Sequence, residues 1–291
     1  MKLLILLILA LATLLPSLAQ AYDVLVLQSR HDRSYDEALK GFRAEWPGSQ
    51  RVLVISDYSE VDVVRIIREE RPRLILTIGD VALKEVRKVR QTPIVALMSL
   101  GINAQAATQP NLTGISLFAA PESYLAAFQA IKARRVGLVI NSAKNETYLR
   151  QARKAAQEMG IELVVAEALS SRDTISHLTT LDGRIDALWM LPDPTVITRN
   201  TVESYFRFAQ EHSLPLISFA PAYLTMGAAA IVDIDRYETG RQAAIMAGRL
   251  LAGEVPPVIT AKSTIKGNPS VLQRLKLSPS LLNGLNSAQR N

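Results

Sequence analysis

The sequence predicts an α/β protein built from two doubly wound parallel-sheet lobes that are joined by a hinge. The chain has 291 residues, 48% of them apolar, which is enough for more than one hydrophobic core. Short and almost continuously apolar runs alternate with segments of helical periodicity, as expected when helices cover both faces of a parallel sheet. The alternating strands and helices fall into two consecutive sets along the chain, and each set is long enough to form one domain. Right-handed crossovers then make each set an open parallel sheet.

The first set supplies four strands and three helices. Its strands are short and rich in valine, leucine and isoleucine, and they cover residues 23–27, 51–55, 74–78 and 94–98. Helices are predicted between them over residues 35–46, 61–70 and 81–90. In the first helix, Tyr35, Ala38, Phe42 and Trp46 share one face, which is therefore the face expected to pack on the sheet.

The second set repeats the pattern and is followed by one more helix. Strands are predicted over residues 135–140, 161–166, 187–191, 216–219 and 228–234. Helices are predicted over residues 121–131, 146–159, 173–182, 195–211 and 237–253. The second of these helices ends before Gly160, because glycine readily adopts the left-handed conformation that terminates a helix.

Residues 1–21 are predicted to be a cleavable secretory signal peptide. Lys2 precedes the apolar run Leu3–Leu15, and Ala19-Gln20-Ala21 places small residues at the cleavage positions. A retained membrane anchor is the alternative, but the run of about 13 residues is shorter than the roughly 20 needed to cross a bilayer. The chain has no cysteine, which excludes a lipoprotein anchor, disulfides and thiolate metal sites. We therefore expect a protein exported to the periplasm.

The basic charge of the chain does not by itself predict a partner. The formal net charge is +6. Basic residues alternate with apolar ones at helical spacing in the runs Arg65–Arg73 and Lys84–Arg90. This spacing favours solvated faces of amphipathic helices over a nucleic-acid-binding stripe. A weak attraction to anionic surfaces stays open.

A ligand site is expected where the predicted strands end. Carboxyl ends of parallel strands share one edge of a sheet, and ligands of such folds bind there. The predicted ligand-binding residues at or beyond these ends are Gln28, Ser29, His31, Tyr35, Gly79, Asp80, Val81, Met98, Ser99, Asn141, Asp193, Thr195 and Phe219. Tyr35, Tyr223 and Trp189 are candidate aromatic platforms, although Trp189 lies inside a strand and is expected in the core.

Three of these residues also have purely structural interpretations. Asp80 precedes a predicted helix and is positioned to cap it. Asp193 is followed by Pro194, a favoured first residue of a helix, so it too is expected to act as a cap. A single histidine such as His31 is more often a surface residue than a ligand or a base. Capping does not exclude a place in the ligand site.

Catalytic and cofactor motifs are missing. The chain has no dinucleotide-binding glycine motif, no P-loop, no nucleophile elbow and no zinc-protease motif. Its three histidines, His31, His177 and His212, lack the spacing of metal ligands. An exported enzyme that uses Asp80 and Asp193 as paired carboxylates is therefore a disfavoured alternative. No catalytic residue, metal ion or cofactor is predicted.

Several sequence runs give the chain a family resemblance. The most specific is Asp235–Ala244 preceded by Gly227, followed by the run Asp186–Val196. Supporting runs are Leu27-Gln28 with Asp36 and Lys40–Phe42, Thr92–Val95, Asn111–Ser116 and Val136–Asn141. Together they resemble the ABC-transporter substrate-binding family with the type I periplasmic binding protein fold, in the branch that includes members binding tryptophan and other aromatic amino acids. The chain departs from many relatives at Asp80, where they have threonine, and at Gly101-Ile102, where they have Asp-Pro.

The resemblance implies a receptor that closes two lobes around a small polar ligand and delivers it to an ABC importer. It implies hinge strands over 111–116 and 230–236. The N-terminal lobe would comprise 22–114 plus about 237–254, and the C-terminal lobe 115–236 plus about 255–291.

The expected partners are a small-molecule ligand and an ABC permease, with no nucleic acid and a monomeric receptor. Arg30, His31 and Arg33 favour an anionic group on the ligand and Asp80 a cationic one, so an amino acid or related metabolite would satisfy both. A ligand-sensing module for a membrane signalling protein is the alternative function.

Overall fold

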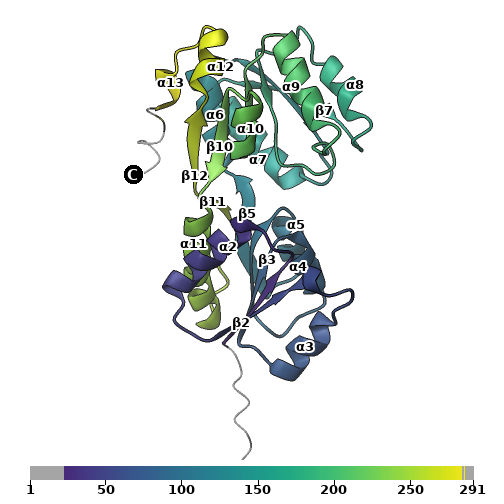
Figure 1. Ribbon diagram of the computed structural model, residues 1–291, viewed down its shortest axis with the longest axis vertical. Helices are drawn as coiled ribbons and strands as arrows, with labels where there is room; N and C mark the ends of the chain where they lie inside the picture. Colours follow the sequence, from purple (N-terminus) through teal and green to yellow (C-terminus); the bar gives the residue numbers. More distant parts are fainter. Residues whose placement is uncertain (1–22, 284, 286–291) are drawn as a thin grey trace, which may run out of the picture.

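The structure, a computed structural model, describes residues 23–283 and 285, so the predicted signal peptide lies outside the described residues. The described chain forms two α/β lobes, one above the other in Figure 1. Each lobe contains one six-stranded sheet. The strand orders are β11-β5-β4-β3-β1-β2 in the first lobe and β12-β10-β9-β8-β6-β7 in the second. Every pair is parallel except β10 with β12. The predicted fold class is confirmed.

The first lobe follows the predicted alternation of strands and helices. Its elements are β1 (Val24–Gln28), α2 (Arg33–Glu45), β2 (Gln50–Val54), the 3₁₀ helix η1 (Ile55–Asp57), α3 (Val63–Glu70), β3 (Leu74–Ile78), α4 (Asp80–Glu85), β4 (Ile94–Ser99), α5 (Ile102–Ala106), β5 (Leu112–Ala119), α11 (Arg236–Leu251) and β11 (Ile259–Ala261). Strands β1, β3 and β4 are buried along their whole length, because helices cover both faces of the sheet. Asp32 and Asp62 begin α2 and α3 by accepting hydrogen bonds from backbone amides.

The second lobe is built in the same way around an aromatic core. Its elements are α6 (Pro121–Ala130), β6 (Arg135–Ile140), α7 (Glu146–Glu158), β7 (Glu162–Glu167), α8 (Thr174–Thr179), β8 (Ala187–Trp189), α9 (Val202–Glu211), β9 (Leu216–Ser218), α10 (Pro221–Met226), β10 (Ala230–Ile234), β12 (Ser263–Gly267), α12 (Pro269–Arg274) and α13 (Ser280–Asn283). Trp189 is fully buried and packs against Tyr124, Phe128 and Tyr148. The expectation that Trp189 belongs to the core is confirmed.

The described chain crosses between the lobes three times. The crossings lead from β5 into α6, from β10 into α11, and from β11 into β12. Helix α11 packs on α2 and thus returns to the first lobe, as Figure 1 also shows. Two crossings lie later in the chain than the boundaries expected from the sequence. Residues 115 and 116 still pair with β4, and β11 pairs with β5, so the chain leaves the first sheet after Ala119 and again at Lys262.

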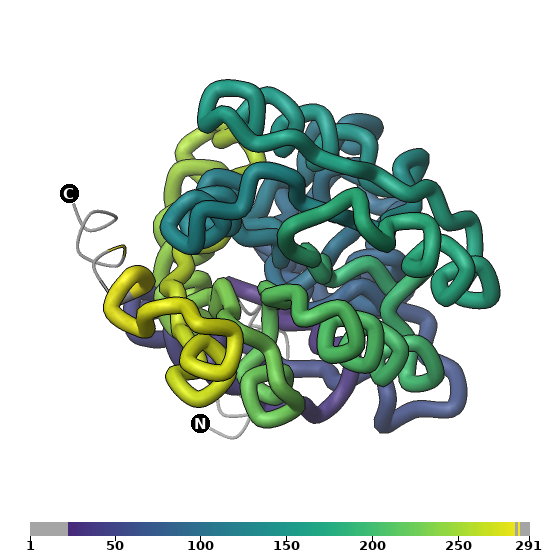
Figure 2. Tube along the Cα trace, turned by 90° about the horizontal axis from the view of Figure 1, so that it is seen from above, coloured from purple at the N-terminus to yellow at the C-terminus, as the bar shows by residue number. Residues whose placement is uncertain are grey.

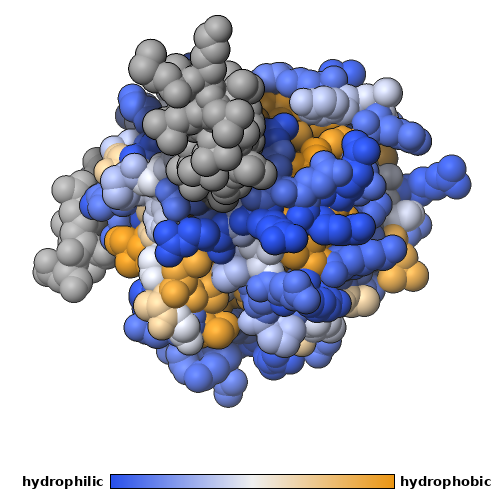
Figure 3. Space-filling model, turned by 90° about the horizontal axis from the view of Figure 1, so that it is seen from below, coloured by the Kyte–Doolittle hydropathy of each residue, from blue (hydrophilic) through white to orange (hydrophobic). Residues whose placement is uncertain are grey.

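Some local elements differ from the sequence prediction. Helix α9 begins at Val202 rather than near 195, because residues 194–196 form an isolated turn. Helix α4 ends at Glu85, and the short α5, α10, β11 and β12 are additional elements. Seen from above, the C-terminal segment with α12 and α13 lies at the rim of the second lobe (Figure 2). Seen from below, the first lobe presents a largely hydrophilic surface with smaller hydrophobic patches (Figure 3).

Candidate functional site

The topology places the predicted strand ends of each lobe at the edge that faces the other lobe. Strand β5 enters the second lobe at its carboxyl end, and its parallel neighbours β4, β3 and β1 end on the same side. Strand β10 returns to the first lobe at its carboxyl end, in parallel with β9, β8 and β6. The candidate site therefore consists of two half-sites, one on each lobe.

The first half-site is organised around Ser29 and Gly79. Ser29 is buried, and its Oγ donates to the carbonyl of Ile78 at 3.0 Å and accepts from the Ala82 amide at 2.9 Å. Ser29 thus satisfies one of the free amides at the start of α4, a role usually filled by the residue before a helix. Gly79 has a φ of 91°, and a Cβ there would lie 2.5 Å from Tyr35 Oη and 2.6 Å from Ser29 Oγ. Glycine is required here for both reasons.

Asp80 binds the loop after β4 rather than capping its own helix. Its Oδ1 accepts hydrogen bonds from the Ser99 hydroxyl and from the amides of Leu100 and Gly101, both at 3.0 Å. The N-cap of α4 is Gly79, so the predicted capping role of Asp80 is wrong. Its Oδ2 has one long contact, 3.3 Å from the Leu100 amide, which leaves this oxygen open to a further donor.

Backbone distortion at the end of β4 directs Ser99 to Asp80. Met98 is buried and has a φ of 55°, a left-handed conformation that is uncommon for residues other than glycine. The pairing of β4 with β5 shifts register between Leu97 and Ser99. Such bulges change the direction of a side chain next to a site. Met98 thus contributes to the first half-site through its backbone conformation rather than through its side chain.

Two of the basic residues predicted at the end of β1, Arg30 and His31, have acidic partners within the first lobe. His31 Nε2 lies 2.9 Å from Asp57 Oδ1, at the end of η1. Arg30 Nη2 lies 2.9 Å from Asp32 Oδ2, and its guanidinium sits 5.6 Å from the centre of the Tyr35 ring. The structure thus groups His31 with Asp57, a residue that the sequence did not single out.

The remaining residues of the first half-site are Gln28, Tyr35 and Val81. Gln28 is buried, and its Nε2 donates to the Arg30 carbonyl at 2.9 Å and to Asp36 Oδ1 at 3.2 Å. Tyr35 is half-buried, which raises the pKa of its phenol above the usual value near 10 and keeps it neutral. Val81 is 50% exposed on the first turn of α4, an apolar side chain on the site's surface.

Asp193 organises the second half-site from a buried position. Only 1% of Asp193 is exposed. Its Oδ2 accepts from the Asn141 amide at 2.8 Å and from Asn145 Nδ2 at 2.9 Å, while its Oδ1 accepts from the Thr195 amide at 2.8 Å. It therefore caps an isolated turn and joins the loop after β8 to the loop after β6. No helix begins there, so the expected capping of a helix over 195–211 is wrong.

Lys144 and Asn145 are site residues that the sequence prediction missed. Lys144 is exposed, and its Nζ lies 3.1 Å from Thr195 Oγ1. Its backbone amide donates to Asn141 Oδ1 at 3.0 Å. Asn145 donates to Asp193 and to the Asn141 carbonyl. The available signal was the run Asn141–Asn145 itself, in which four of five side chains are polar and follow a buried strand.

Aromatic rings cluster after the carboxyl end of β9. Phe219 is partly exposed and meets Tyr223 edge to face, with 5.1 Å between ring centres. Tyr223 also contacts Phe206 at 5.9 Å. Burial raises the pKa of the Tyr223 phenol, which therefore stays neutral. Tyr223 and Phe219 thus form an aromatic pair that carries one phenol group.

The structure gathers the predicted residues within each lobe but does not join the two half-sites. Among the described residues, no hydrogen bond or ion pair links the two groups. No cluster of three or more histidine or acidic residues in the described part could hold a metal ion. None of the described helices combines the length and apolar composition needed to span a bilayer.

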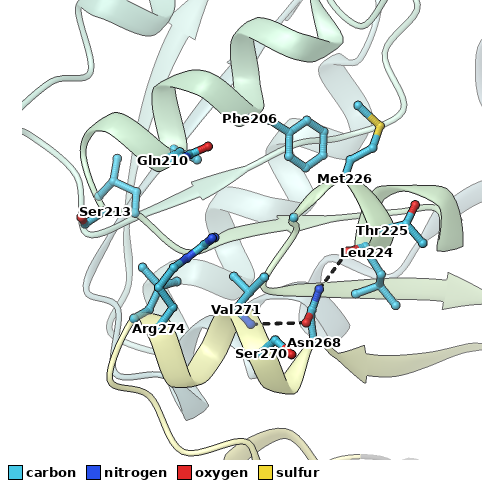
Figure 4. A pocket seen from close by; sticks show the side chains of 14 residues that line it. Phe206, Gln210, Ser213, Leu224, Thr225, Met226, Asn268, Ser270, Val271 and Arg274 are labelled. Carbon is cyan, nitrogen blue, oxygen red and sulfur yellow. Dashed lines mark hydrogen bonds between the residues drawn. The ribbon is translucent and has the colours of Figure 1, made fainter.

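A separate pocket of about 530 Å³ lies on the outer side of the second lobe, away from both half-sites. Figure 4 shows its lining from α9, α10 and α12. Its polar groups bind one another: Asn268 Nδ2 donates to the Leu224 carbonyl at 2.8 Å, and its Oδ1 accepts from the Val271 amide at 3.3 Å. Because none of the predicted ligand-binding residues lines this pocket, we do not assign the ligand to it.

Comparison with known proteins matches most of the chain to one family. A family model described as ABC transporter substrate binding protein matches residues 53–278. No curated protein is similar enough to count as a match.

Solved structures of similar fold cover nearly the whole chain. A conserved domain protein from Vibrio cholerae has 23% identity and a TM-score of 0.65, over 91% of this chain and 98% of the relative. A Streptococcus pneumonia ABC domain in complex with L-Trp has 19% identity and a TM-score of 0.65, over 89% and 97%. The ligand-free, open structure of a Clostridium difficile substrate binding protein with adhesive properties has 18% identity and a TM-score of 0.69, over 88% and 95%. At these identities the likeness concerns the fold.

Proposed function

Because the chain belongs to the ABC transporter substrate binding protein family, we propose that it is a periplasmic receptor for a small zwitterion, an amino acid or a related metabolite, which it delivers to an ABC importer. One observation carries the choice of ligand. The half-site on the first lobe offers the carboxylate of Asp80, and the half-site on the second lobe offers the ammonium of Lys144. A ligand with one positive and one negative end satisfies both lobes.

The free donors and acceptors support an orientation for this ligand. Asp80 Oδ2 is the more open oxygen of its carboxylate and would accept from the ligand's ammonium group. Lys144 and the Thr195 hydroxyl lie 3.1 Å apart and would together bind the ligand's carboxylate. Asp193 is a positioning residue in this proposal, because its three hydrogen bonds fix the loops that carry Asn141 and Thr195.

Closure of the lobes would couple binding to transport. Ligand that binds both half-sites favours the closed state by its differential affinity for that state. A hinge of crossing segments permits the motion, and an importer that contacts both lobes distinguishes closed from open receptor. The predicted signal peptide supports export to the periplasm, where a receptor of this kind would meet its ligand.

An amino acid with a large apolar side chain fits the surroundings best. Tyr35 and Val81 border Asp80 on the first lobe, and Phe219 and Tyr223 lie on the second. A relative of the same fold is in complex with L-Trp, which supports an amino acid as the ligand class.

Thermal-shift screening of amino acids, followed by titration calorimetry on the best ligand, tests the proposal. We expect Asp80→Asn and Lys144→Met each to weaken binding by at least about tenfold, equal to about 1.4 kcal/mol. The control is Glu146→Gln, an exposed carboxylate two residues after Lys144 that pairs with Arg150, and it should leave the affinity unchanged. Wild-type affinity in both site variants would contradict the assigned ligand contacts.

Delivery to an importer needs a separate measurement. Cells that lack this protein should lose most uptake of the identified ligand, and the wild-type gene should restore it. Unchanged uptake, together with a lost transcriptional response to the ligand, would favour the sensing function instead.

A further inference from the structure

We propose that a basic groove on the first lobe docks the protein on membranes that carry anionic phospholipid headgroups. The groove lies between α3 and the segment that follows α4, and its volume is about 660 Å³. The residues that line it are Val64, Ile67, Arg68, Arg71, Pro72, Lys88, Val89, Arg90, Gln91 and Thr92. Four of these ten residues are basic and none is acidic.

The four cations keep their charge unpaired. Arg68, Arg71, Lys88 and Arg90 are exposed, and no ion pair in the described part of the chain includes them. The nearest acidic residues along α3 have other partners, since Glu69 pairs with Arg65 and Glu70 with Arg51. Because these carboxylates do not neutralise the groove, a positive potential remains over it.

Arg71 occupies a backbone position that would favour glycine. It follows the last turn of α3 with a φ of 49° and a ψ of 54°, and its amide donates to the Ile67 carbonyl. Glycine adopts this left-handed conformation at no steric cost, whereas for arginine the conformation is sterically unfavourable. Pro72 then prevents the helix from continuing. The chain thus carries a cation at a position where conformation alone would select against it.

The location of the groove leaves the ligand site free. Its residues precede β3 and β4, so it lies at the amino ends of the strands, opposite the half-sites at their carboxyl ends. This is the largely hydrophilic pole of the first lobe seen from below in Figure 3. A membrane bound there would not cover either half-site.

The start of the described chain supports a membrane as the occupant. Asp23 lies at the same pole, 3.3 Å from Arg73 and bonded through its carbonyl to the Leu74 amide. The apolar run of the predicted signal peptide ends at Leu15. The eight residues from Pro16 to Asp23 can span at most about 28 Å. Before the predicted cleavage removes it, the leader would therefore keep this pole close to the lipid surface during export.

The lining favours lipid headgroups over nucleic acids or a protein partner. No aromatic side chain lines the groove, so bases would have nothing on which to stack. Its apolar residues Ile67 and Val89 are at least nine-tenths buried and offer little surface to an apolar partner helix. A lipid surface requires only positive charge. Each basic residue near an anionic membrane strengthens binding by about fivefold.

Vesicle flotation tests this proposal with the chain from Tyr22 onward, which contains every described residue. Vesicles of phosphatidylglycerol mixed with phosphatidylcholine should bind the protein, and vesicles of phosphatidylcholine alone should not. The variant Arg68→Gln/Arg71→Gln/Lys88→Gln/Arg90→Gln should bind at least about tenfold more weakly, and added salt should weaken wild-type binding. Circular dichroism confirms that the variant is folded.

A matched control separates the groove from net charge. The variant Arg153→Gln/Arg172→Gln/Arg199→Gln/Arg207→Gln removes four exposed cations, without ion-pair partners among the described residues, from the second lobe. It should keep most of the vesicle binding. Equal loss in both variants would overturn the proposal, as would an absence of binding to anionic vesicles. Binding of soluble glycerol phosphate or of single-stranded DNA without binding to vesicles would overturn it too, by assigning the groove to another anion.

Discussion

Polar residues at the strand ends serve first to hold the loops of each half-site. Asp80 and Asp193 both accept several hydrogen bonds from loops that follow neighbouring strands. Each carboxylate thereby fixes backbone that is far from it in the chain but adjacent in the sheet. A ligand that meets loops already held in place loses less free energy to ordering them. The proposed contacts of Asp80 Oδ2 and Lys144 Nζ depend on this support.

Asp193→Asn should lower the free energy of unfolding by about 2 kcal/mol. The carboxylate is buried and accepts three hydrogen bonds, whereas an amide in its place presents an NH₂ group to at least one of the same donors. Urea unfolding measures the loss. Asn145→Ala removes only one of the three donors and should cost less. An equal or smaller loss in Asp193→Asn would contradict the assigned role.

The site residues could be predicted individually, but their partners could not. The rule that ligands bind at carboxyl ends of parallel strands selects Ser29, Asp80 and Asp193 from the sequence alone. Which group each one binds depends on the strand order and on bulges, such as the register shift that directs Ser99 to Asp80. The pairing of His31 with Asp57 bridges 26 residues, and no local pattern indicates it.

At the scale of elements, two glycines allow α11 to pack directly on α2. A Cβ on Gly240 would overlap the carbonyl oxygen of Ala38, and one on Gly41 would overlap that of Tyr237. The backbones of the two helices are therefore in contact, and this contact holds the returning helix on the first lobe. Both glycines fall in the runs that carry the family resemblance.

Gly240→Ala should destabilise the protein by at least about 2 kcal/mol, since the added methyl group has no space and the helices must separate. The matched control is Gly248→Ala on the same helix, where nothing lies within 4 Å of the added Cβ. This control should stabilise by about 0.5–1 kcal/mol through helix propensity. Thermal unfolding compares the two variants, and similar midpoints would contradict the packing argument.

Asp186 fastens the start of β6 to the start of β8 and should make stability depend on pH. Its carboxylate accepts from the Arg135 side chain at 2.8 Å and from the amides of Arg134 and Arg135. The Arg135 hydrogen bond, with those from the amides, holds the pKa of Asp186 below its ordinary value. The ionised form is therefore favoured by folding. The stabilisation by the ionised Asp186 carboxylate is therefore fully present above the pKa of aspartate in the unfolded chain, near 3.9. It is lost as the pH falls through the lower pKa that Asp186 has in the folded protein.

Asp186→Asn should accordingly cost about 1 kcal/mol at neutral pH, and the difference from wild type should shrink below about pH 4. Urea unfolding across this pH range measures it. Glu158→Gln, which removes one exposed carboxylate 3.9 Å from Lys154, serves as the control and should change stability by less than about 0.5 kcal/mol throughout. A constant difference between Asp186→Asn and wild type at all pH values would refute the assignment.

The elements most accessible to sequence reasoning were the buried strands and the long helices. Continuous apolar runs place β1, β3 and β4 correctly, because helices bury both faces of the sheet. Strands β11 and β12 have exposed residues and little periodicity, so they were missed. The early start predicted for α9 came from Pro194 after Asp193, a pair that here begins an isolated turn.

At the scale of the whole molecule, ion pairs connect the crossings between the lobes. Asp233 on β10 is buried and pairs with Arg236 at 3.0 Å and with Lys266 on β12 at 2.7 Å. Lys262, at the third crossing, pairs with Glu238 on α11 at 3.0 Å. The second and third crossings are therefore tied together and should move as one unit. The first crossing, after β5, completes the hinge.

Closure around a ligand should bring two rigid lobes together without changing either one. Since the chain has no cysteine, the pair Ala104→Cys/Thr147→Cys can be spin-labelled selectively on α5 and α7, one on each lobe. Double electron–electron resonance should report a shorter distance between the two spin labels once the ligand identified by calorimetry is saturating. The pair Thr147→Cys/Glu203→Cys, with both labels on the second lobe, should show no change. An unchanged distance between the lobes with ligand bound would contradict closure, and a change within the second lobe would show that the lobe itself rearranges.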